Sequence, residues 1–305
     1  MTPDGATHPA VAGAGGASPA RQRVVAVVPL RDGSSGKSRL ATVLDPAERS
    51  RLIATLARHV VGTLLASESV ERVLVVTSDP RFTWRALGSL VEPVPPPMDD
   101  APPTVTDPPA EGDAPAGRGR PAPPPTVTGS PAEGDGDSAE GDGPGRLQIV
   151  LQPASRPGLN AALDVGREIV ASLAADPGTS AEGATGRPVR LLVAHADLPA
   201  LTTEDIEVLV AADAPVVVAT DRARSGTNLL VLDADAPFTF RFGVGSLAAH
   251  LAEADRRGVR AAVVQRTGTA VDLDTLDDWS ELPADVRARD ELVDLHRAMD
   301  RAHRS

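Results

Sequence analysis

The chain contains no cysteine among its 305 residues, and this absence removes several kinds of site at once. Disulfides, thiolate metal sites, iron–sulfur clusters and cysteine nucleophiles are all excluded. Aromatic residues make up only 2% of the chain and tyrosine is missing. A folded core must therefore consist mainly of aliphatic side chains.

Also lacking is any apolar run close to the roughly 18 residues that a membrane span needs. Residues 1–20 are rich in small residues and proline, without the basic start and apolar centre of a signal peptide. We therefore expect a disordered N-terminal tail at 1–20 and a cytoplasmic protein. Neither a membrane nor a nucleic acid is expected as a partner.

The negative charge is concentrated in one segment. Residues 92–145 hold eleven acidic residues and two arginines, a balance of −9 within a total of −12. The segment is rich in Pro, Gly, Ala and Thr, and a stretch that begins at Pro102 returns at Pro124. Such a composition cannot bury enough apolar surface to fold. We expect a low-complexity insertion at 93–145 within one domain over 21–290, followed by a C-terminal helix or tail at 291–305.

Short apolar runs alternate with helical patterns in the remaining chain. These runs predict strands buried on both faces at 24–29, 70–77, 147–151, 189–194, 216–219 and 261–264. Helices are expected after Asp45-Pro46, at about 159–174, after the capping-box pattern Thr202–Asp205, and at about 246–257. The fold class is therefore α/β, with a doubly wound, mostly parallel sheet. In such sheets, ligands bind beyond the carboxyl ends of the strands.

A basic loop follows the first strand. Gly36-Lys37-Ser38 resembles the end of a P-loop, but the P-loop pattern needs glycine where this chain has Arg31. A Gly/Ser loop with Arg31, Lys37 and Arg39 still suits nucleotide phosphates, because backbone N–H groups and cations converge there. The alternative is a solvent-exposed basic turn.

Aspartates follow two of the other strands. Asp197 comes shortly after the run 189–194, while Asp272 and Asp274 follow the last run and share one side if the segment is extended. One or two carboxylates plus substrate phosphates are typical of a Mg²⁺ site. His195 is expected to be a loop histidine rather than a metal ligand or a base. The alternative is that the aspartates serve as turn or N-cap residues.

Two small-residue loops lie between these aspartates in the sequence. The loop 222–228 offers Thr227, and the loop 240–246 offers Gly243 and Ser246, which we expect to cap the following helix. A helix N-terminus can bind a phosphate. Two anion loops, a basic loop and aspartates on one sheet edge fit metal-assisted phosphoryl or nucleotidyl transfer.

The order of these motifs is more specific than any one of them. They are Pro29-Leu30-Arg31, Lys37-Ser38-Arg39-Leu40, Gly158-Leu159-Asn160-Ala161-Ala162, Asp197-Leu198-Pro199, Ser225-Gly226-Thr227-Asn228, Phe242-Gly243 with Ser246 and His250, and Asp272 with Asp274-Thr275. Over about residues 24–280, this set resembles the guanylyltransferase family of coenzyme F420 biosynthesis.

The resemblance implies a nucleotidyltransferase fold of the glycosyltransferase-A type. It also implies Mg²⁺-dependent transfer of GMP from GTP to phosphoenolpyruvate, with release of pyrophosphate. The alternative acceptors are 2-phospho-L-lactate and 3-phosphoglycerate, and the next enzyme of the pathway is a conceivable transient partner.

Roles for single residues follow from the same resemblance. Asp197 and Asp272 are expected to hold Mg²⁺, with Asp274 as the next choice. Lys37, helped by Arg39 and Arg31, would neutralise the triphosphate. The remaining residues are Asn160 in the nucleotide or acceptor pocket, and Thr227, Gly243 and Ser246 at the acceptor phosphate.

Three features depart from the family pattern. Arg31 stands where lysine is usual, His195 stands where a small or apolar residue is usual, and the insertion at 93–145 is added. None of them removes a residue that the chemistry requires. Two alternatives remain, namely another nucleotidyltransferase of the same fold, whose Gly-rich opening loop this chain does not match, and a non-catalytic partner protein.

Overall fold

The structure, a computed structural model, describes residues 23–31, 37–91, 145–175 and 189–302. The expected tail at 1–20, nearly all of the insertion at 93–145 and residues 32–36 of the basic loop lie outside these ranges. Within them, no helix is at once long enough and apolar enough to cross a membrane.

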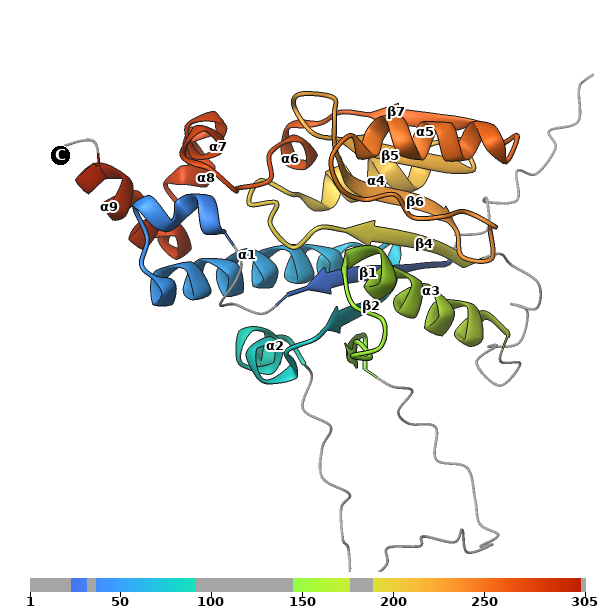
Figure 1. The fold of residues 1–305 in the computed structure, drawn as a ribbon, viewed down its shortest axis with the longest axis horizontal. Coiled ribbons are helices and arrows are strands. Elements are labelled where there is room, and N and C mark those ends of the chain that lie inside the picture. Colours follow the sequence, from blue (N-terminus) through green and yellow to red (C-terminus); the bar gives the residue numbers. More distant parts are fainter. Residues whose placement is uncertain (1–22, 32–36, 92–144, 176–188, 303–305) are drawn as a thin grey trace, which may run out of the picture. The chain divides into compact units, whose positions relative to one another are not determined.

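A seven-stranded sheet lies at the centre of the described fold (Figure 1). In spatial order its strands are β3 (Leu147–Leu151), β2 (Val70–Thr77), β1 (Arg23–Leu30), β4 (Val189–Ala194), β6 (Thr227–Asp233), β5 (Val216–Thr220) and β7 (Ala261–Val264). β6 runs antiparallel to β4 and β5, and the other neighbouring pairs are parallel. The prediction of a mostly parallel α/β sheet is confirmed.

Strand β6 was not predicted from the sequence. Thr227 and Asn228, which we assigned to a loop, are the first residues of this strand, and the first six of its seven residues are buried. A short turn over 221–226 joins β5 to β6, and so short a connection requires the two strands to be antiparallel.

Helices cover both faces of the sheet. One face packs against α1 (Pro46–Ala66), α2 (Pro80–Leu87) and α4 (Thr203–Ala211), and the other against α3 (Leu159–Ala175) and α5 (Ser246–Arg256). Alternation along β1 explains this division, since Val24 and Ala26 belong to the first core and Val25 and Val27 to the second. The expected helix starts at Asp45 and Thr202 are confirmed, because both residues form capping boxes.

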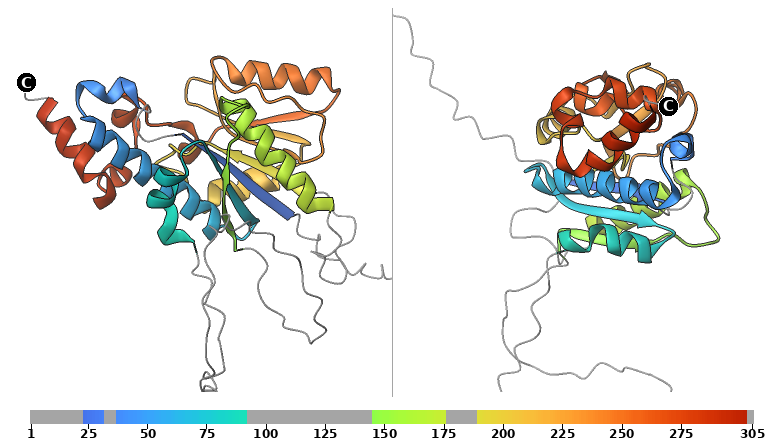
Figure 2. Two further views of the ribbon diagram at one scale, coloured as in Figure 1. Left: turned by 60° about the horizontal axis from the view of Figure 1, so that its bottom comes forward. Right: turned by 90° about the vertical axis from the view of Figure 1, so that its left-hand side faces the viewer.

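A third apolar cluster lies near the carboxyl ends of the strands. It joins α1 to several short elements, namely η1 (Ser38–Thr42), α7 (Leu276–Glu281), α8 (Ala284–Arg287), η4 (Asp290–Leu292) and α9 (Val293–Ala302). Figure 2 shows the C-terminal helices beside the first part of α1. Leu40 and Leu273 are fully buried in this cluster. Because Leu273 lies between two candidate aspartates, the cluster supports the segment that carries them.

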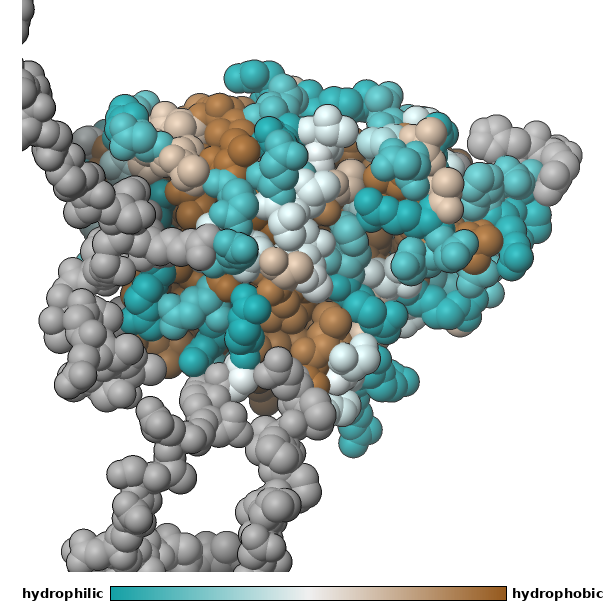
Figure 3. All heavy atoms as spheres, turned by 180° about the vertical axis from the view of Figure 1, so that it is seen from behind, coloured by the Kyte–Doolittle hydropathy of each residue, from teal (hydrophilic) through white to brown (hydrophobic). Residues whose placement is uncertain are grey.

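The outer surface is mostly polar. On the face opposite to that of Figure 1, hydrophilic residues predominate and hydrophobic areas appear at the upper left and the lower centre (Figure 3). Among the described residues, the large apolar side chains that are more than half exposed are Trp84, Leu151 and Val244. Two further short elements, η2 (Gly88–Leu90) and α6 (Thr267–Ala270), complete the described fold.

Candidate functional site

Three aspartates and one lysine meet at the carboxyl ends of β1 and β4. One carboxylate oxygen each of Asp197, Asp272 and Asp274 lies within 4.8 Å of the other two. Lys37 Nζ donates to Asp197 Oδ2 at 2.6 Å and to Asp274 Oδ1 at 2.7 Å. The side chain of Lys37 is only 6% exposed, against 25% for Asp197 and 40% for Asp274. The structure thus brings together four residues that the sequence analysis selected.

The segment 272–274 is not extended, contrary to the premise of the sequence analysis. The N–H of Asp274 donates to the carbonyl oxygen of Asp272 at 3.1 Å, so the chain turns between them. Both carboxylates nevertheless reach the cluster. Directly after this turn Thr275 caps α7, because its side chain accepts a hydrogen bond from the N–H of Asp278 in a capping box.

Asp197 and Asp272 lie in different electrostatic surroundings, which shift their pKa values in opposite directions. Burial disfavours the charged form of Asp197, but the adjacent Lys37 ammonium outweighs it and holds the pKa of Asp197 below its usual range. Burial also acts against the charge of Lys37, yet Asp197 and Asp274 raise its pKa overall. For Asp272, by contrast, burial and then the neighbouring Asp197 raise the pKa. Asp272 is therefore the carboxylate that a further cation would stabilise most.

One atom of Asp197 also fits a bound cation. Its Oδ2 accepts from Lys37, whereas Oδ1 is buried and has no hydrogen-bond partner among the described residues. A buried carboxylate oxygen without a partner is costly, so a ligand or ion that contacts it is favoured. Two hard oxygen donors, from Asp197 and Asp272, match the ligands that Mg²⁺ prefers.

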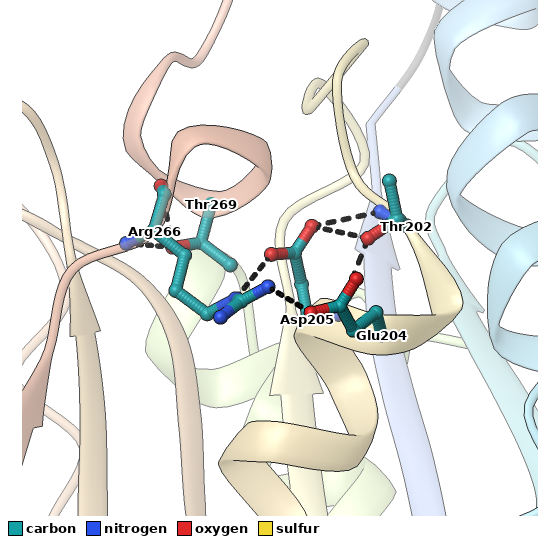
Figure 4. Close-up of polar contacts among 5 residues, drawn as sticks. All are labelled: Thr202, Glu204, Asp205, Arg266 and Thr269. Carbon is teal, nitrogen blue, oxygen red and sulfur yellow. Dashed lines mark hydrogen bonds and ion pairs between the residues drawn. The ribbon is translucent and has the colours of Figure 1, made fainter.

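Two loops that carry these aspartates are held together directly. The N–H of Leu273 donates to the carbonyl oxygen of Asp197 at 3.0 Å. The neighbouring helices are joined as well: Arg266 Nε, at the N-cap of α6, donates to Asp205 Oδ1, in the first turn of α4, at 2.6 Å. The other oxygen of Asp205 accepts from the N–H and the hydroxyl of Thr202 (Figure 4). The Asp205 side chain is only 4% exposed. This ion pair therefore joins the start of α4, which follows the loop of Asp197, to the start of α6, which precedes the loop of Asp272.

A glycine permits the close approach of these loops. A Cβ atom on Gly268 would lie 1.9 Å from Asp205 Oδ2 and 2.7 Å from the carbonyl oxygen of Ala200. Both distances are shorter than any contact that carbon makes with oxygen, and the second oxygen belongs to the backbone. Sequence reasoning missed Asp205 in this role, together with Arg266 and Gly268, because the contact joins positions 61 residues apart.

A cavity of about 310 Å³ opens beside the acidic cluster. Its lining includes Lys37, Asp197, Asp272 and Asp274, together with Arg31 and His195. A second hollow of about 340 Å³ shares Pro29, Leu30, Arg31 and Leu159 with the first and extends along Gln152, Pro153 and Gly158. Two adjoining hollows at the carboxyl ends of strands match the usual place of ligands in open α/β sheets.

The other predicted cations differ in position. Arg31 is exposed and lines both hollows, and Arg39 is exposed on η1, two residues after Lys37. His195, to which the sequence analysis gave no chemical role, lines the first cavity. Its Nε2 is buried without a hydrogen-bond partner among the described residues. The departure from the family pattern at this position is the signal that pointed to it.

The predicted anion loops pack against each other near this cavity. The N–H of Leu247, at the start of α5, donates to the carbonyl oxygen of Ser225 at 3.1 Å. Ser246 is not the N-cap that we expected, because it is the first residue of α5 and Gly245, at φ 71°, caps the helix without a side chain. Gly243 also has a positive φ of 134°, which favours glycine.

Asn160 fixes the position of the second anion loop. Its Nδ2 donates to the carbonyl oxygen of Phe242 at 3.1 Å, and its Oδ1 accepts from the N–H of Phe242 at 2.9 Å. The Phe242 ring in turn lies 5.2 Å from the ring of His195, centroid to centroid. Through these contacts the loop of Gly243 borders the cavity that the acidic cluster lines.

Comparisons with known proteins agree with this geometry. Residues 146–290 match the family model described as "Guanylyl transferase CofC like". The chain is 33% identical over 266 residues to a phosphoenolpyruvate guanylyltransferase of Rubrobacter xylanophilus, covering 86% of this chain and 94% of that protein. It is 30% identical over 260 residues to a phosphoenolpyruvate guanylyltransferase of Sphaerobacter thermophilus, covering 85% and 91%.

Another relative carries a different substrate in its name. A 3-phospho-D-glycerate guanylyltransferase of Phenylobacterium zucineum is 28% identical over 278 residues, covering 88% of this chain and 95% of that protein. Among solved structures, a Desulfovibrio desulfuricans protein classed with the nucleotide-diphospho-sugar transferases superposes with a TM-score of 0.57 at 10% identity, covering 92% and 97%. That likeness concerns the fold alone.

Proposed function

Because the chain belongs to the family of CofC-like guanylyl transferases, we propose that it transfers GMP from GTP to phosphoenolpyruvate. The reaction forms a bond between a phosphate oxygen of the acid and the α-phosphorus of GTP. It breaks the bond from that phosphorus to the bridging oxygen of the β-phosphate, and pyrophosphate leaves. The product fits coenzyme F420 biosynthesis, and the cytoplasm is the expected location.

The observation that carries this proposal is the acidic cluster with Lys37, which lines one of two adjoining hollows. Nucleotidyl transfer needs cations where negative charge gathers and a place for each of two anionic substrates. Lys37 is buried and positively charged at this point, and Arg31 lines both hollows. We assign Lys37 to the triphosphate, with Arg31 and Arg39 as helpers.

A Mg²⁺ ion fits the carboxylate set. The unpartnered Oδ1 of Asp197 and the raised pKa of Asp272 favour these two residues as its ligands. Asp274 is engaged by Lys37 and is the alternative second ligand. When bound, the ion would act as a Lewis acid toward the phosphate oxygens.

We assign the acceptor acid to the two anion loops beside the cavity. Thr227, Gly243 and Ser246 would bind the phosphate of the acid, and Asn160 holds the loop that contains Gly243. The names of two relatives favour phosphoenolpyruvate. The name of another relative keeps 3-phosphoglycerate as an alternative, beside 2-phospho-L-lactate.

Pyrophosphate release tests the proposal. Purified protein is supplied with GTP, Mg²⁺ and each of the three acids in turn, and then with ATP, CTP or UTP in place of GTP. We expect turnover with GTP and phosphoenolpyruvate to exceed every other combination. Silence with all three acids, beside an active member of the family, would contradict the proposal.

A further inference from the structure

A buried histidine lies beneath the proposed acceptor site. His250 is fully buried on α5, one helical turn after Ser246, so the two side chains lie on the same face of the helix. Its Nδ1 lies 2.9 Å from the hydroxyl oxygen of Thr227. Its Nε2 accepts from the N–H of Arg241 at 3.0 Å. His250 therefore links β6 to the loop that holds Gly243.

These two contacts fix the position of the ring hydrogen. A backbone N–H is always a donor, so the Nε2 that faces Arg241 carries no hydrogen. A neutral imidazole with a free Nε2 carries its hydrogen on Nδ1. His250 Nδ1 thus donates to Thr227 Oγ1, and the hydroxyl hydrogen of Thr227 must point to another acceptor.

The surroundings of His250 keep the ring neutral. Burial is the main cause that lowers its pKa to about 4, and His195 acts in the same direction while Glu253 opposes it. Glu253 is itself fully buried and is engaged by the N–H of Thr239 and by Arg257 Nε. A second ring hydrogen would also point at the N–H of Arg241, which the observed contact excludes.

We propose that His250 is a positioning residue that makes the Thr227 hydroxyl a hydrogen-bond donor to the acceptor phosphate. Its N–H occupies one lone pair of the hydroxyl oxygen, so the hydroxyl hydrogen is available to an anion. This inference rests on the proposed function for the identity of the anion. The charged non-bridging oxygens of a phosphate accept hydrogen bonds, so a hydroxyl that is held as a donor suits them.

Two amide substitutions separate the two contacts of His250. In His250→Asn the amide nitrogen takes the place of Nδ1 and can still donate to Thr227. In His250→Gln the amide oxygen takes the place of Nε2 and can still accept from Arg241. We expect His250→Gln to raise the KM for phosphoenolpyruvate by about 10- to 100-fold, the effect of one hydrogen bond to a charged group. His250→Asn should raise it less, and the KM for GTP should stay within about twofold.

A double substitution tests whether His250 acts through Thr227. Thr227→Val alone should raise the KM for phosphoenolpyruvate by a similar factor, and adding His250→Gln to it should cause little further change. The proposal would be overturned if the two substitutions raise the KM independently, or if His250→Asn raises it more than His250→Gln does. Either result would mean that His250 only holds the loop in place. His296→Gln, on the exposed surface of α9, serves as the control.

The ring hydrogen can be located without any turnover. Nitrogen NMR of the wild-type protein, labelled in histidine, should place the hydrogen of His250 on Nδ1. A hydrogen on Nε2 would overturn the inference. If the wild-type protein is active and its His250 variants match it, only this inference fails. If the wild-type protein is silent with all three acids, the proposed function fails, and calorimetry with phosphoenolpyruvate then shows whether Thr227→Val and His250→Gln weaken binding together.

Discussion

The N–H of Leu273 donates to the carbonyl oxygen of Asp197, and this bond joins the two loops that carry the acidic cluster. Leu273 is fully buried in the third apolar cluster, so the bond is shielded on the side of the C-terminal helices. The distance between Asp197 and Asp272 therefore depends on backbone contacts rather than on flexible side chains. Substitutions of these side chains should therefore change the charge of the site without moving its backbone.

The first prediction concerns the metal ligands. Asp197→Asn and Asp272→Asn should each lower kcat by at least about 100-fold, since a bound cation contributes several kcal/mol to the reaction. Asp272→Asn should also stabilise the metal-free protein at pH 7, because the raised pKa of Asp272 reflects an unfavourable buried charge. Melting temperatures with and without MgCl₂ provide the measurement. Asp277→Asn, an exposed acid in the first turn of α7, is the control.

The second prediction concerns Lys37. Lys37→Met should destabilise the metal-free protein by about 1–3 kcal/mol, because it leaves Asp197 and Asp274 without their shared cation. MgCl₂ should then stabilise this variant more than the wild type, since the lysine no longer competes for Asp197. Arg39→Met, on an exposed side chain nearby, should show the wild-type response. Equal responses in the two variants would show that Lys37 and the ion occupy separate places.

The third prediction concerns the link between the loops. Gly268→Ala should cost more than about 2 kcal/mol and lower kcat, because the new Cβ displaces Asp205 or the backbone of Ala200. Gly62→Ala is the matched control, since its Cβ meets open space within a helix and should be neutral or stabilising. Urea denaturation and single-turnover rates give the two readouts.

A matched pair of arginines refines that test. Arg266→Met leaves the buried Asp205 without its 2.6 Å partner, and we expect a loss of stability together with weaker Mg²⁺ binding. Arg260→Met removes an exposed pair with Asp213 and should change neither. Unaltered Mg²⁺ binding in Arg266→Met would limit the link to a stabilising role.

The fourth prediction concerns pH. The pKa of His250 is lowered from 6.5 to about 4 in the folded protein, so the unfolded chain binds a proton between these values that the folded protein does not. Stability should therefore fall as the pH drops from 6.5 toward 4, by roughly 3 kcal/mol from this group. His250→Gln should lose this part of the slope in denaturation measured at pH 7, 6, 5 and 4.5. Parallel slopes in the two proteins would contradict the prediction.

The fifth prediction concerns the acidic insertion. Deletion of residues 96–142 should leave kcat and both KM values within about twofold, because the composition of this segment does not support a folded core. The deleted segment is acidic, so the comparison is made at two ionic strengths to separate charge from fold. A tenfold rise of either KM at both ionic strengths would assign the insertion a part in substrate binding.

Six of the seven strands and the acidic cluster were predictable from the sequence for one physical reason. Buried parallel strands have continuous apolar runs, and ligands of α/β sheets gather where such runs end. This rule and the family motifs together pointed to Lys37, Asp197 and Asp272. The pKa difference between Asp197 and Asp272 was not predictable, since it depends on which of them Lys37 contacts.

Other features depend on contacts that no local pattern encodes. The pair of Asp205 and Arg266 joins distant segments, and so does the bridge from His250 to Thr227. The cap of α5 was assigned to Ser246 because serine is favoured at N-caps, whereas Gly245, with its positive φ, is the N-cap and places the helix start one residue earlier. Strand β6 was missed because its first residues, Thr227 and Asn228, were assigned to a loop.

The reversal of β6 has a consequence for how this enzyme can diversify. Ala194, at the end of β4, pairs with Leu229 near the beginning of β6, so one rim of the sheet presents a strand exit beside a strand entry. Asp197, a proposed metal ligand, follows the exit of β4, while Thr227 stands at the entry of β6. With the roles proposed above, substitutions at the entry would alter the choice of acceptor acid while the strand exits stay unchanged. We therefore expect relatives that use different acids to differ at that entry and its adjoining loop.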